Sequence, residues 1–368
     1  MSNTHYYPCE EWERIEPETA DFDPQRLKAA VAYAIHHETP WLRDLPKSIY
    51  ANFPEPPEYG GILGPTQERG GPNGLILRDG RIVAEWGDTS RVDMTFSVSK
   101  SFLSVCAGLA IDQGLIRSVN DRVRDYCNDG GFNPPHNHKI TWHHLLQQTS
   151  EWEGTLWGKP DLIDRNREVG TEATNSKKGT HRNLQNPGTY WEYNDVRVNR
   201  LSLSLLQVWR RPLPEVLREI VMEPICASDK WVWHGYRNSF ATIDGRQLQA
   251  VSGGAHWGGG MFISSSDQAR FGLMMLRRGR WRDRQILSEE WIARTIHPCD
   301  ANPSYGYLFW LNRQPKRYPT APESSFFALG AGHNVVWMDP DHELVVVVRW
   351  IAQDHIDGFI QRVLAALR

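Results

Sequence analysis

Apolar residues near the start of the chain recur at the spacing of a helix. After Asp23-Pro24 they are three to four residues apart, so one face of the segment is apolar. Asp23 suits the position that caps a helix and Pro24 suits its first turn, so the pattern predicts that the helix begins there. Residues 39–73 are rich in Pro and Gly and predict a long surface loop without regular structure.

The pattern then changes to that of β-strands. Apolar segments 75–77 and 82–84 flank Asp79-Gly80, which is typical of a β-hairpin. Strand patterns return only near the end of the chain, before a last amphipathic helix over residues 356–367. The strand segments predicted there are 307–311, 326–329, 335–338 and 344–350.

These patterns predict an α+β fold in which both chain ends build one antiparallel sheet of about five strands, flanked by helices. The sheet subdomain would contain residues 1–95 and 301–368, with 1–70 as an N-terminal extension that holds one helix and a long loop. Residues 96–300 are expected to form a mainly helical subdomain. A ligand site is expected in the cleft where the two parts meet.

Composition narrows the classes of partner. A formal charge of −3, with no block of Lys or Arg, excludes nucleic acid as a main partner. Residues 1–23 are polar and contain no apolar core of a signal peptide. The apolar run 344–348 is too short to cross a bilayer, so no membrane partner is expected. The oligomeric state does not follow from the sequence.

The cysteines bear on the compartment. The chain has five of them, an odd number, widely spaced and without a Cys-x-x-Cys pair. This pattern does not indicate a disulfide framework, and the cytoplasm is the simplest compartment for such a chain.

The main candidate for chemistry is the pair Ser97 and Lys100, which begins an apolar helical stretch just after the hairpin. Spacing by three residues puts both side chains on one face of a helix. Free N–H groups at a helix start stabilise negative charge, and a partly desolvated lysine loses its proton more readily. The pair therefore fits an activated serine nucleophile. The same four residues also fit a non-catalytic role, in which Ser97 only caps the helix and Lys100 is a solvated surface residue. The motif occurs only once in the chain, which favours the catalytic interpretation.

A second element follows the turn Pro187-Gly188. Tyr190 and Trp191 fit a loop packed on the core. Tyr193 differs when it is considered with Ser97 and Lys100, because a phenol beside a lysine can pass a proton to a leaving group.

Together these segments resemble the serine β-lactamase and penicillin-binding protein superfamily, in particular its class C β-lactamase-like branch with family VIII carboxylesterases and 6-aminohexanoate-dimer hydrolase. The match runs in order from about residue 70 to the C-terminus. The segments that carry it are Ser97–Lys100, Gly114-Leu115-Ile116, Asn120–Val123, Ile140–Ser150, Tyr193-Asn194-Asp195, Gly258–Ser264 and Asp267–Gly272. The resemblance implies a β-lactamase/transpeptidase-like fold and an oxyanion hole formed by the backbone N–H groups of Ser97 and Ala331.

Two departures from the family pattern bear on the substrate. Tyr-x-Asn reads Tyr193-Asn194-Asp195 here, so an acid stands beside the nucleophile, where it can accept a hydrogen bond from Lys100. The third family motif corresponds to Ala328-Leu329-Gly330, which lacks the cationic or imidazole side chain that helps to hold a β-lactam carboxylate. The missing side chain in the third motif favours a neutral ester or amide over a β-lactam, whereas Asp195 adds a negative charge beside the nucleophile.

The remaining candidates are histidines. His256 precedes Trp257 and a glycine run, and it either packs in the core or contacts substrate at the cleft; the same two roles are open for His333. Without a His-Glu-x-x-His motif, the histidine clusters fit structural or surface roles, so no metal or cofactor is predicted. The absence of Gly-x-Ser-x-Gly argues against an α/β-hydrolase.

The sequence thus predicts a serine hydrolase that forms an acyl-enzyme on a small-molecule ester or amide. Ser97 is the expected nucleophile, and Lys100 and Tyr193 are the expected base and acid. A weak β-lactamase or D-amino-peptidase is the alternative among enzymes. A non-catalytic binding protein on the same fold is the alternative from another class.

Overall fold

The computed structural model describes residues 5–9, 11–170 and 172–368, and both ends of the chain build its central antiparallel sheet. The strand order is β11-β12-β13-β14-β1-β2, which confirms the predicted sheet and its hairpin with six strands instead of about five. The strands are β1 (Asn73–Arg78), β2 (Arg81–Trp86), β11 (Trp310–Leu311), β12 (Phe326–Gly330), β13 (Asn334–Asp339) and β14 (Leu344–Arg349). The central strand β14 is buried along its whole length, which explains its unbroken apolar run 344–348.

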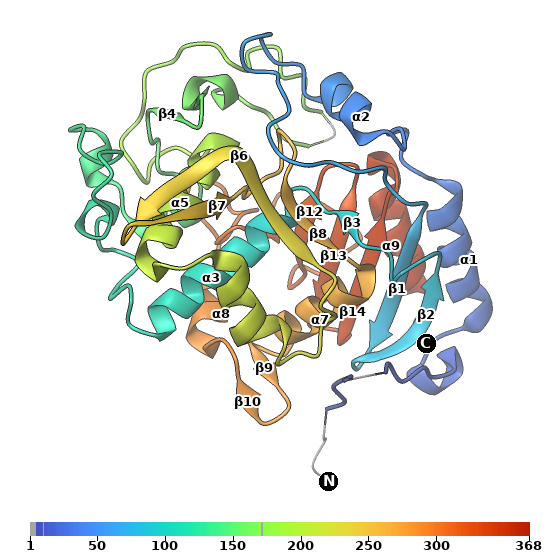
Figure 1. Cartoon of the computed structure of the whole chain (residues 1–368). Coiled ribbons are helices and arrows are strands. Elements are labelled where there is room, and N and C mark those ends of the chain that lie inside the picture. Colours follow the sequence, from blue (N-terminus) through green and yellow to red (C-terminus); the bar gives the residue numbers. More distant parts are fainter. Residues whose placement is uncertain (1–4, 10, 171) are drawn as a thin grey trace.

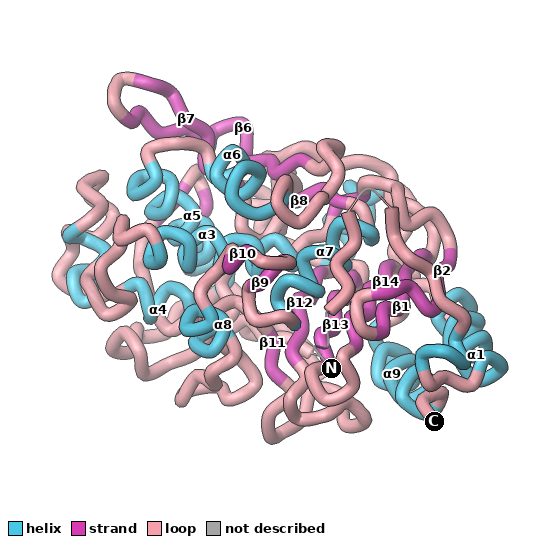
Figure 2. Tube along the Cα trace, turned by 90° about the horizontal axis from the view of Figure 1, so that it is seen from below, coloured by secondary structure: helices cyan, strands magenta, loops and turns pink. Residues whose placement is uncertain are grey.

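Helices cover both faces of the sheet (Figures 1 and 2). α1 (Pro24–His36) packs with α9 (Ile356–Ala365) on one face, where Phe359 of α9 meets Trp86 of β2. Asp23 caps α1 as predicted, because its carboxylate accepts hydrogen bonds from two N–H groups of the first turn. α3 (Val98–Asp112) and α7 (Ser265–Leu276) pack against the sheet from the other side.

The middle of the chain supplies further helices, and one of them covers the central sheet. Its helices, besides α3 and α7, are α4 (Trp142–Leu146), α5 (Asp195–Trp209), α6 (Leu213–Leu217) and α8 (Glu289–Thr295). α7 lies within residues 96–300 but contacts β1, β13 and β14, so it belongs to the layer that covers the sheet.

The structure also contains a second sheet that the sequence did not predict, with one strand just before residue 96 and three within residues 96–300. Its order is β3-β8-β6-β7, and it includes a long hairpin of β6 and β7. The register of β6 with β7 shifts between Gly235 and Phe240, so its apolar residues do not keep the alternation by which a strand is recognised. The strands of this second sheet are β3 (Asp93–Met94), β6 (Val232–Ile243), β7 (Arg246–Val251) and β8 (Gly260–Ile263). Two further pairs of short strands are separate from it: β4 (Thr155–Leu156) with β5 (Lys159–Pro160), and β9 (Arg280–Trp281) with β10 (Arg284–Gln285).

Two other local predictions were wrong. Residues 39–73 are not a structureless surface loop, because α2 (Leu45–Asn52) lies within them and buries Leu45 and Ile49 against a small apolar cluster. A helix of only eight residues gives a short apolar pattern, which the surrounding prolines obscured. The strand predicted over 307–311 is limited to β11, because Leu308 has a φ of 61° and cannot continue an extended strand.

The cysteines also differ from expectation. Cys9 and Cys226, which are 217 residues apart in sequence, form a disulfide, while Cys106, Cys127 and Cys299 are free and buried. An odd cysteine count does not exclude a single long-range bridge, so the sequence argument against disulfides was wrong. In the described part of the chain, no helix has the length and apolar character needed to span a bilayer.

Candidate active site

Ser97 stands at the start of α3, where its hydroxyl donates only a long hydrogen bond, 3.5 Å, to the Gly254 carbonyl. The preceding residue, Phe96, has a φ of 51°, a left-handed conformation that is costly for a bulky side chain. Phe96 is held there by packing against Trp41, and the Ser99 hydroxyl donates to the Phe96 carbonyl at 2.7 Å. The Ser97 side chain makes no capping hydrogen bond to its own helix, so it is free to face the cleft.

Lys100 meets Ser97 as the spacing predicts. Its Nζ donates to Ser97 Oγ at 2.9 Å, and its side chain is 1 % exposed. Nζ also forms an ion pair with Asp195 Oδ1. Burial lowers the pKa of Lys100, but the Asp195 carboxylate and Tyr193 together outweigh burial and hold that pKa above its ordinary value. The resting lysine is therefore an ammonium, which differs from the readily deprotonated amine that the sequence led us to expect.

Tyr193 and Asp195 come from the turn that leads into α5. The Tyr193 ring centroid lies 4.6 Å from Lys100 Nζ, so the three predicted side chains meet in one place. Asn194 caps α5 through its side-chain oxygen, which accepts from the N–H groups of Val196 and Arg197. Asp195 is consequently the first residue of the helix, directed back toward Lys100.

Arg167 adjoins the predicted side chains, and the sequence did not reveal it. Its guanidinium donates to Asp195 Oδ2 at 2.7 Å and pairs with Asp164 at 3.4 Å. Its Cζ lies 5.2 Å from the centroid of the Tyr193 ring, so two cations, Lys100 and Arg167, lie near that ring. Burial raises the pKa of Asp195, but Lys100 and Arg167 together hold it well below its ordinary value.

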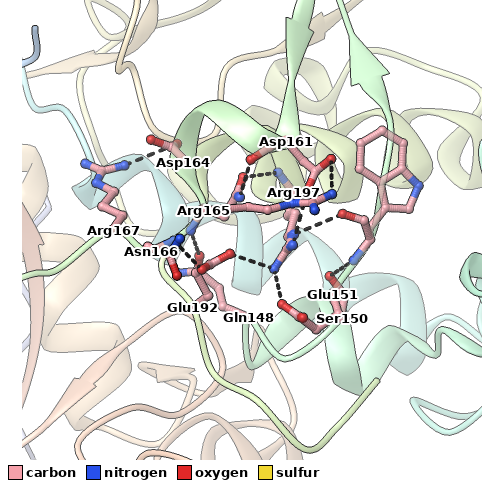
Figure 3. A network of polar contacts seen from close by, with 12 residues as sticks. Gln148, Ser150, Glu151, Asp161, Asp164, Arg165, Asn166, Arg167, Glu192 and Arg197 are labelled. Carbon is pink, nitrogen blue, oxygen red and sulfur yellow. Dashed lines mark hydrogen bonds and ion pairs between the residues drawn. The ribbon is translucent and has the colours of Figure 1, made fainter. Parts of the chain in front are cut away.

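A buried ionic network supports this turn from behind (Figure 3). At its centre Arg197 of α5 contacts Glu151 at 2.7 Å, Glu192 at 3.1 Å and Asp161 at 3.2 Å, and all four side chains are nearly inaccessible to solvent. Glu192 precedes Tyr193 directly, so Arg197 ties the turn that carries the phenol to α5.

The end of β12 lies beside Ser97. A Cβ built on Gly330 would overlap the carbonyl oxygen of Thr95 and lie 3.3 Å from the Ser97 nitrogen, so only glycine allows this approach. The next residue, Ala331, leaves the strand. Within the described residues, neither the Ser97 N–H nor the Ala331 N–H has a hydrogen-bond acceptor. Two unpaired donors thus stand at the place where the resemblance expects an oxyanion hole.

The two predicted histidines have different surroundings. His256 is buried in the wall of the cleft, where Nδ1 lies 3.2 Å from Asp195 Oδ2 and Nε2 lies 2.7 Å from Glu55 Oε1. His333 lies beyond Ala331 with Nε2 2.9 Å from Gln353 Oε1, and its burial lowers its pKa. Neither side chain contacts Ser97.

An open cleft of about 1280 Å³ connects these groups. The predicted junction of sheet and helical lobe is therefore hollow enough for a small-molecule ligand. Its lining includes Phe53, Ser97, Arg167, Tyr193, His256, Leu329 and Ala331.

A candidate cation site adjoins the cleft. It consists of three side chains, Glu55, Asp164 and His256, each of which has one ligand atom close enough to the others to share an ion. The ammonium of Lys178 already occupies this position, 2.6 Å from Glu55 and 3.3 Å from Asp164. The residues present therefore pair with a lysine and do not fit a resident metal.

Comparisons with known proteins bear on the family and the fold of the chain. The Beta-lactamase family model matches residues 67–355, more than half of the chain, whereas no curated protein matches its sequence. Many solved structures have this fold. One is a putative 6-aminohexanoate-dimer hydrolase from Bacillus anthracis (13 % identity, TM-score 0.59, covering 99 % of this chain and 89 % of that one). Two others are the hydrolase EstCE1, which has promiscuous acyltransferase activity (16 %, 0.59, 93 % and 98 %), and a penicillin-binding protein homologue from Caulobacter crescentus (16 %, 0.58, 94 % and 99 %). Both the resemblance read from the motifs and the predicted fold class are confirmed: this chain belongs to the beta-lactamase family.

Proposed function

We propose that the protein is a serine hydrolase that cleaves carboxylic esters or small amides through an acyl-enzyme on Ser97. The observation that carries the proposal is the contact of Lys100 Nζ with Ser97 Oγ at 2.9 Å, at a helix start that opens on the cleft, with Tyr193 against the same ammonium. A hydroxyl in contact with an amine, with the ring of a phenol 4.6 Å from that amine, supplies the groups that nucleophilic acyl transfer requires.

In the first step Ser97 Oγ bonds to the substrate carbonyl carbon while its proton passes to the Lys100–Tyr193 pair. Because Asp195 keeps Lys100 as an ammonium, which cannot accept a proton, we assign the acceptor position to the Tyr193 oxygen as a phenolate, whose own proton has passed to solvent before this step. The positive charges of Lys100 and Arg167 stabilise the negative charge that this oxygen carries when it acts as the acceptor. The ammonium holds Ser97 Oγ in place.

The remaining steps use the backbone donors and the same phenol. The N–H groups of Ser97 and Ala331 bind the oxyanion of the tetrahedral intermediate. The bond to the leaving oxygen or nitrogen then breaks, and Tyr193 returns the proton to that atom. Water attacks the acyl-enzyme, giving its proton to the same pair, and the acid leaves as Ser97 regains its hydroxyl.

The preference for neutral esters or amides rests on the third motif. Ala328 is a small buried residue, and Leu329 presents an apolar side chain to the cleft next to Gly330. A strand without a cation there gives no positive charge to hold a β-lactam carboxylate. A weak β-lactamase or D-amino-peptidase activity is the alternative.

The test is covalent labelling with a fluorophosphonate probe. We expect stoichiometric labelling of the protein and loss of labelling in Ser97→Ala. Ser90→Ala, which changes an exposed serine on a loop, is the matched control and should label normally. If the protein labels with no acylating agent, including nitrocefin, the function is that of a non-catalytic binding protein on this fold. If nitrocefin is turned over faster than short p-nitrophenyl esters, the ester preference is wrong.

The cytoplasmic location remains a proposal from the sequence, and the Cys9–Cys226 disulfide argues against it, because such bridges are typical of oxidising compartments. Acid quenching of cells, followed by alkylation of the free thiols in denaturant, tests it. Alkylation at all five cysteines supports the cytoplasm, while alkylation at only the three unbridged ones contradicts it.

A further inference from the structure

Glu55 reaches the charged groups around Ser97 from a segment that precedes the family match. The Beta-lactamase model begins at residue 67, whereas Glu55 lies on the loop after α2. Its side chain is 2 % exposed, and its Oε1 contacts His256 Nε2 at 2.7 Å and Lys178 Nζ at 2.6 Å. A carboxylate is rarely buried so completely unless it is paired, so this position has a specific use.

His256 links Glu55 to Asp195. Its two ring nitrogens face two carboxylates, Glu55 through Nε2 and Asp195 through Nδ1. The ring is fixed between Phe53 and Trp257, whose centroids lie 4.6 and 4.3 Å from its own. The imidazole is thus held in the one orientation that serves both acids.

Asp195 is in turn held on every side. Oδ1 pairs with Lys100, and Oδ2 accepts from Arg167 and lies against His256. On the remaining side Gly254 packs so closely that an added Cβ would overlap Asp195 Oδ1 and lie 2.6 Å from Lys100 Nζ. Any shift of His256 would therefore move the carboxylate that pairs with Lys100.

We infer that Glu55 and His256 are positioning residues that hold Asp195 against Lys100, so that the segment before the family domain sets the charge on the lysine beside the nucleophile. The effect on catalysis rests on the proposed function, whereas the effect on the charge of Lys100 does not. Among the described residues, the charged and titratable groups that face this array are Lys100, Lys159, Arg167 and Lys178, opposed by Glu55, Asp164 and Asp195, together with His256, Tyr193, Tyr236 and Tyr305.

The proposal predicts opposite effects for the two outer members of the array. Glu55→Gln removes a negative charge, so the excess positive charge favours neutral Lys100 and its pKa should fall. Lys178→Met removes a positive charge, so the pKa of Lys100 should rise. Each shift should be about one pH unit, the effect of a unit charge about 10 Å away in a medium of effective dielectric constant about 20. A purely structural role would not give shifts of opposite sign.

The experiment is a ¹³C NMR titration of lysine side chains in the full-length protein, with Lys100 assigned by its absence in Lys100→Arg. It is run in the pH range where circular dichroism shows a folded protein. Glu55→Asp, which keeps the charge, should return the titration toward that of the wild type. Glu290→Gln, which removes the carboxylate of an exposed ion pair on α8, is the matched control and should leave Lys100 unchanged.

The same variants are then compared in the rate of fluorophosphonate labelling against pH. The labelling rate should fall at high pH, where Lys100 loses its proton. The pH of this fall should be lower in Glu55→Gln and higher in Lys178→Met than in the wild type. The inference is overturned if the two variants move the Lys100 titration in the same direction or leave it unmoved. If Glu55→Gln does not fold, the other two variants test the inference: the pKa of Lys100 should rise in Lys178→Met and stay near that of the wild type in Glu55→Asp. A wild type that does not label, but whose Lys100 titration shifts as described, would refute the proposed function and leave the positioning role supported.

Discussion

Lys100 and Asp195 form an ion pair in which each side chain is 1 % exposed. Because the two groups are in contact, the charge of Asp195 favours the charged form of Lys100, and the reverse also holds. The pair lies beside Ser97. Each ion would be costly to bury alone, and their contact lets both remain ionised. This relationship separates the chain from the Tyr-x-Asn pattern of its family, in which an amide stands at position 195.

Asp195→Asn, which restores the family amide, should therefore change the pH dependence of acylation. Without the carboxylate, the pKa of Lys100 should fall by about one to two units. The alkaline limb of fluorophosphonate labelling should move to lower pH by that amount. The variant should also lose about 3 kcal/mol of unfolding free energy, because Lys100 and Arg167 would lose their buried partner. Labelling rates between pH 6 and 11 check this prediction, and an unchanged alkaline limb would contradict it.

The pair also shows what sequence patterns can predict. Ser97 and Lys100 are neighbours on one helix, so their spacing alone predicted the contact. Tyr193 joins them from another element, and only its place in an ordered set of motifs pointed to it. Asp195 was recognised as a partner for Lys100, but the consequence for the lysine's charge depends on burial, which spacing does not give.

Arg167, Glu55 and Lys178 had no such signal. They lie on loops whose composition predicts only a surface, and their role follows from long-range contacts with Asp195 and His256. The one available clue was chemical: an acid placed beside a catalytic lysine needs further cations to balance it. The β6–β7 hairpin was missed for a different reason, because its irregular register breaks the alternation that identifies strands.

Acid should destabilise the protein through its buried carboxylates. Asp164, Asp195 and Glu151 all have pKa values below their ordinary values of 3.8 and 4.5, chiefly because cations nearby outweigh the effect of burial. Groups with lowered folded-state pKa values stabilise the fold above their ordinary pKa, and this contribution declines as the pH falls toward the folded-state values. Urea midpoints should therefore depend little on these groups between pH 5 and 7 and fall steeply below about pH 4. A midpoint that stays level down to pH 3 would contradict the assignment.

Arg197 should be essential for stability, because it alone contacts three buried acids. Arg197→Met leaves Glu151, Glu192 and Asp161 short of a partner and should cost about 3–5 kcal/mol of unfolding free energy. The matched control is Arg294→Met, which breaks an exposed ion pair with Glu290 on α8 and should cost about 0.5 kcal/mol or less. Urea unfolding followed by circular dichroism measures both. Equal losses of unfolding free energy in the two variants would show that the buried network contributes no more to stability than an exposed ion pair.

Gly330→Ala should impair acylation without abolishing the fold. A Cβ at this position would overlap the Thr95 carbonyl and crowd the Ser97 nitrogen, so β12 must move away from the start of α3. The Ala331 N–H would then leave the oxyanion position, and loss of one such donor slows acyl transfer by about 10²–10³-fold. Gly61→Ala is the matched control, because a Cβ there meets no atom within 4 Å. The rate constant for fluorophosphonate labelling at saturating probe is the measurement, with the urea midpoint as a check on folding. If Gly330→Ala labels as fast as Gly61→Ala while both are folded, the backbone donor of Ala331 takes no part in the reaction.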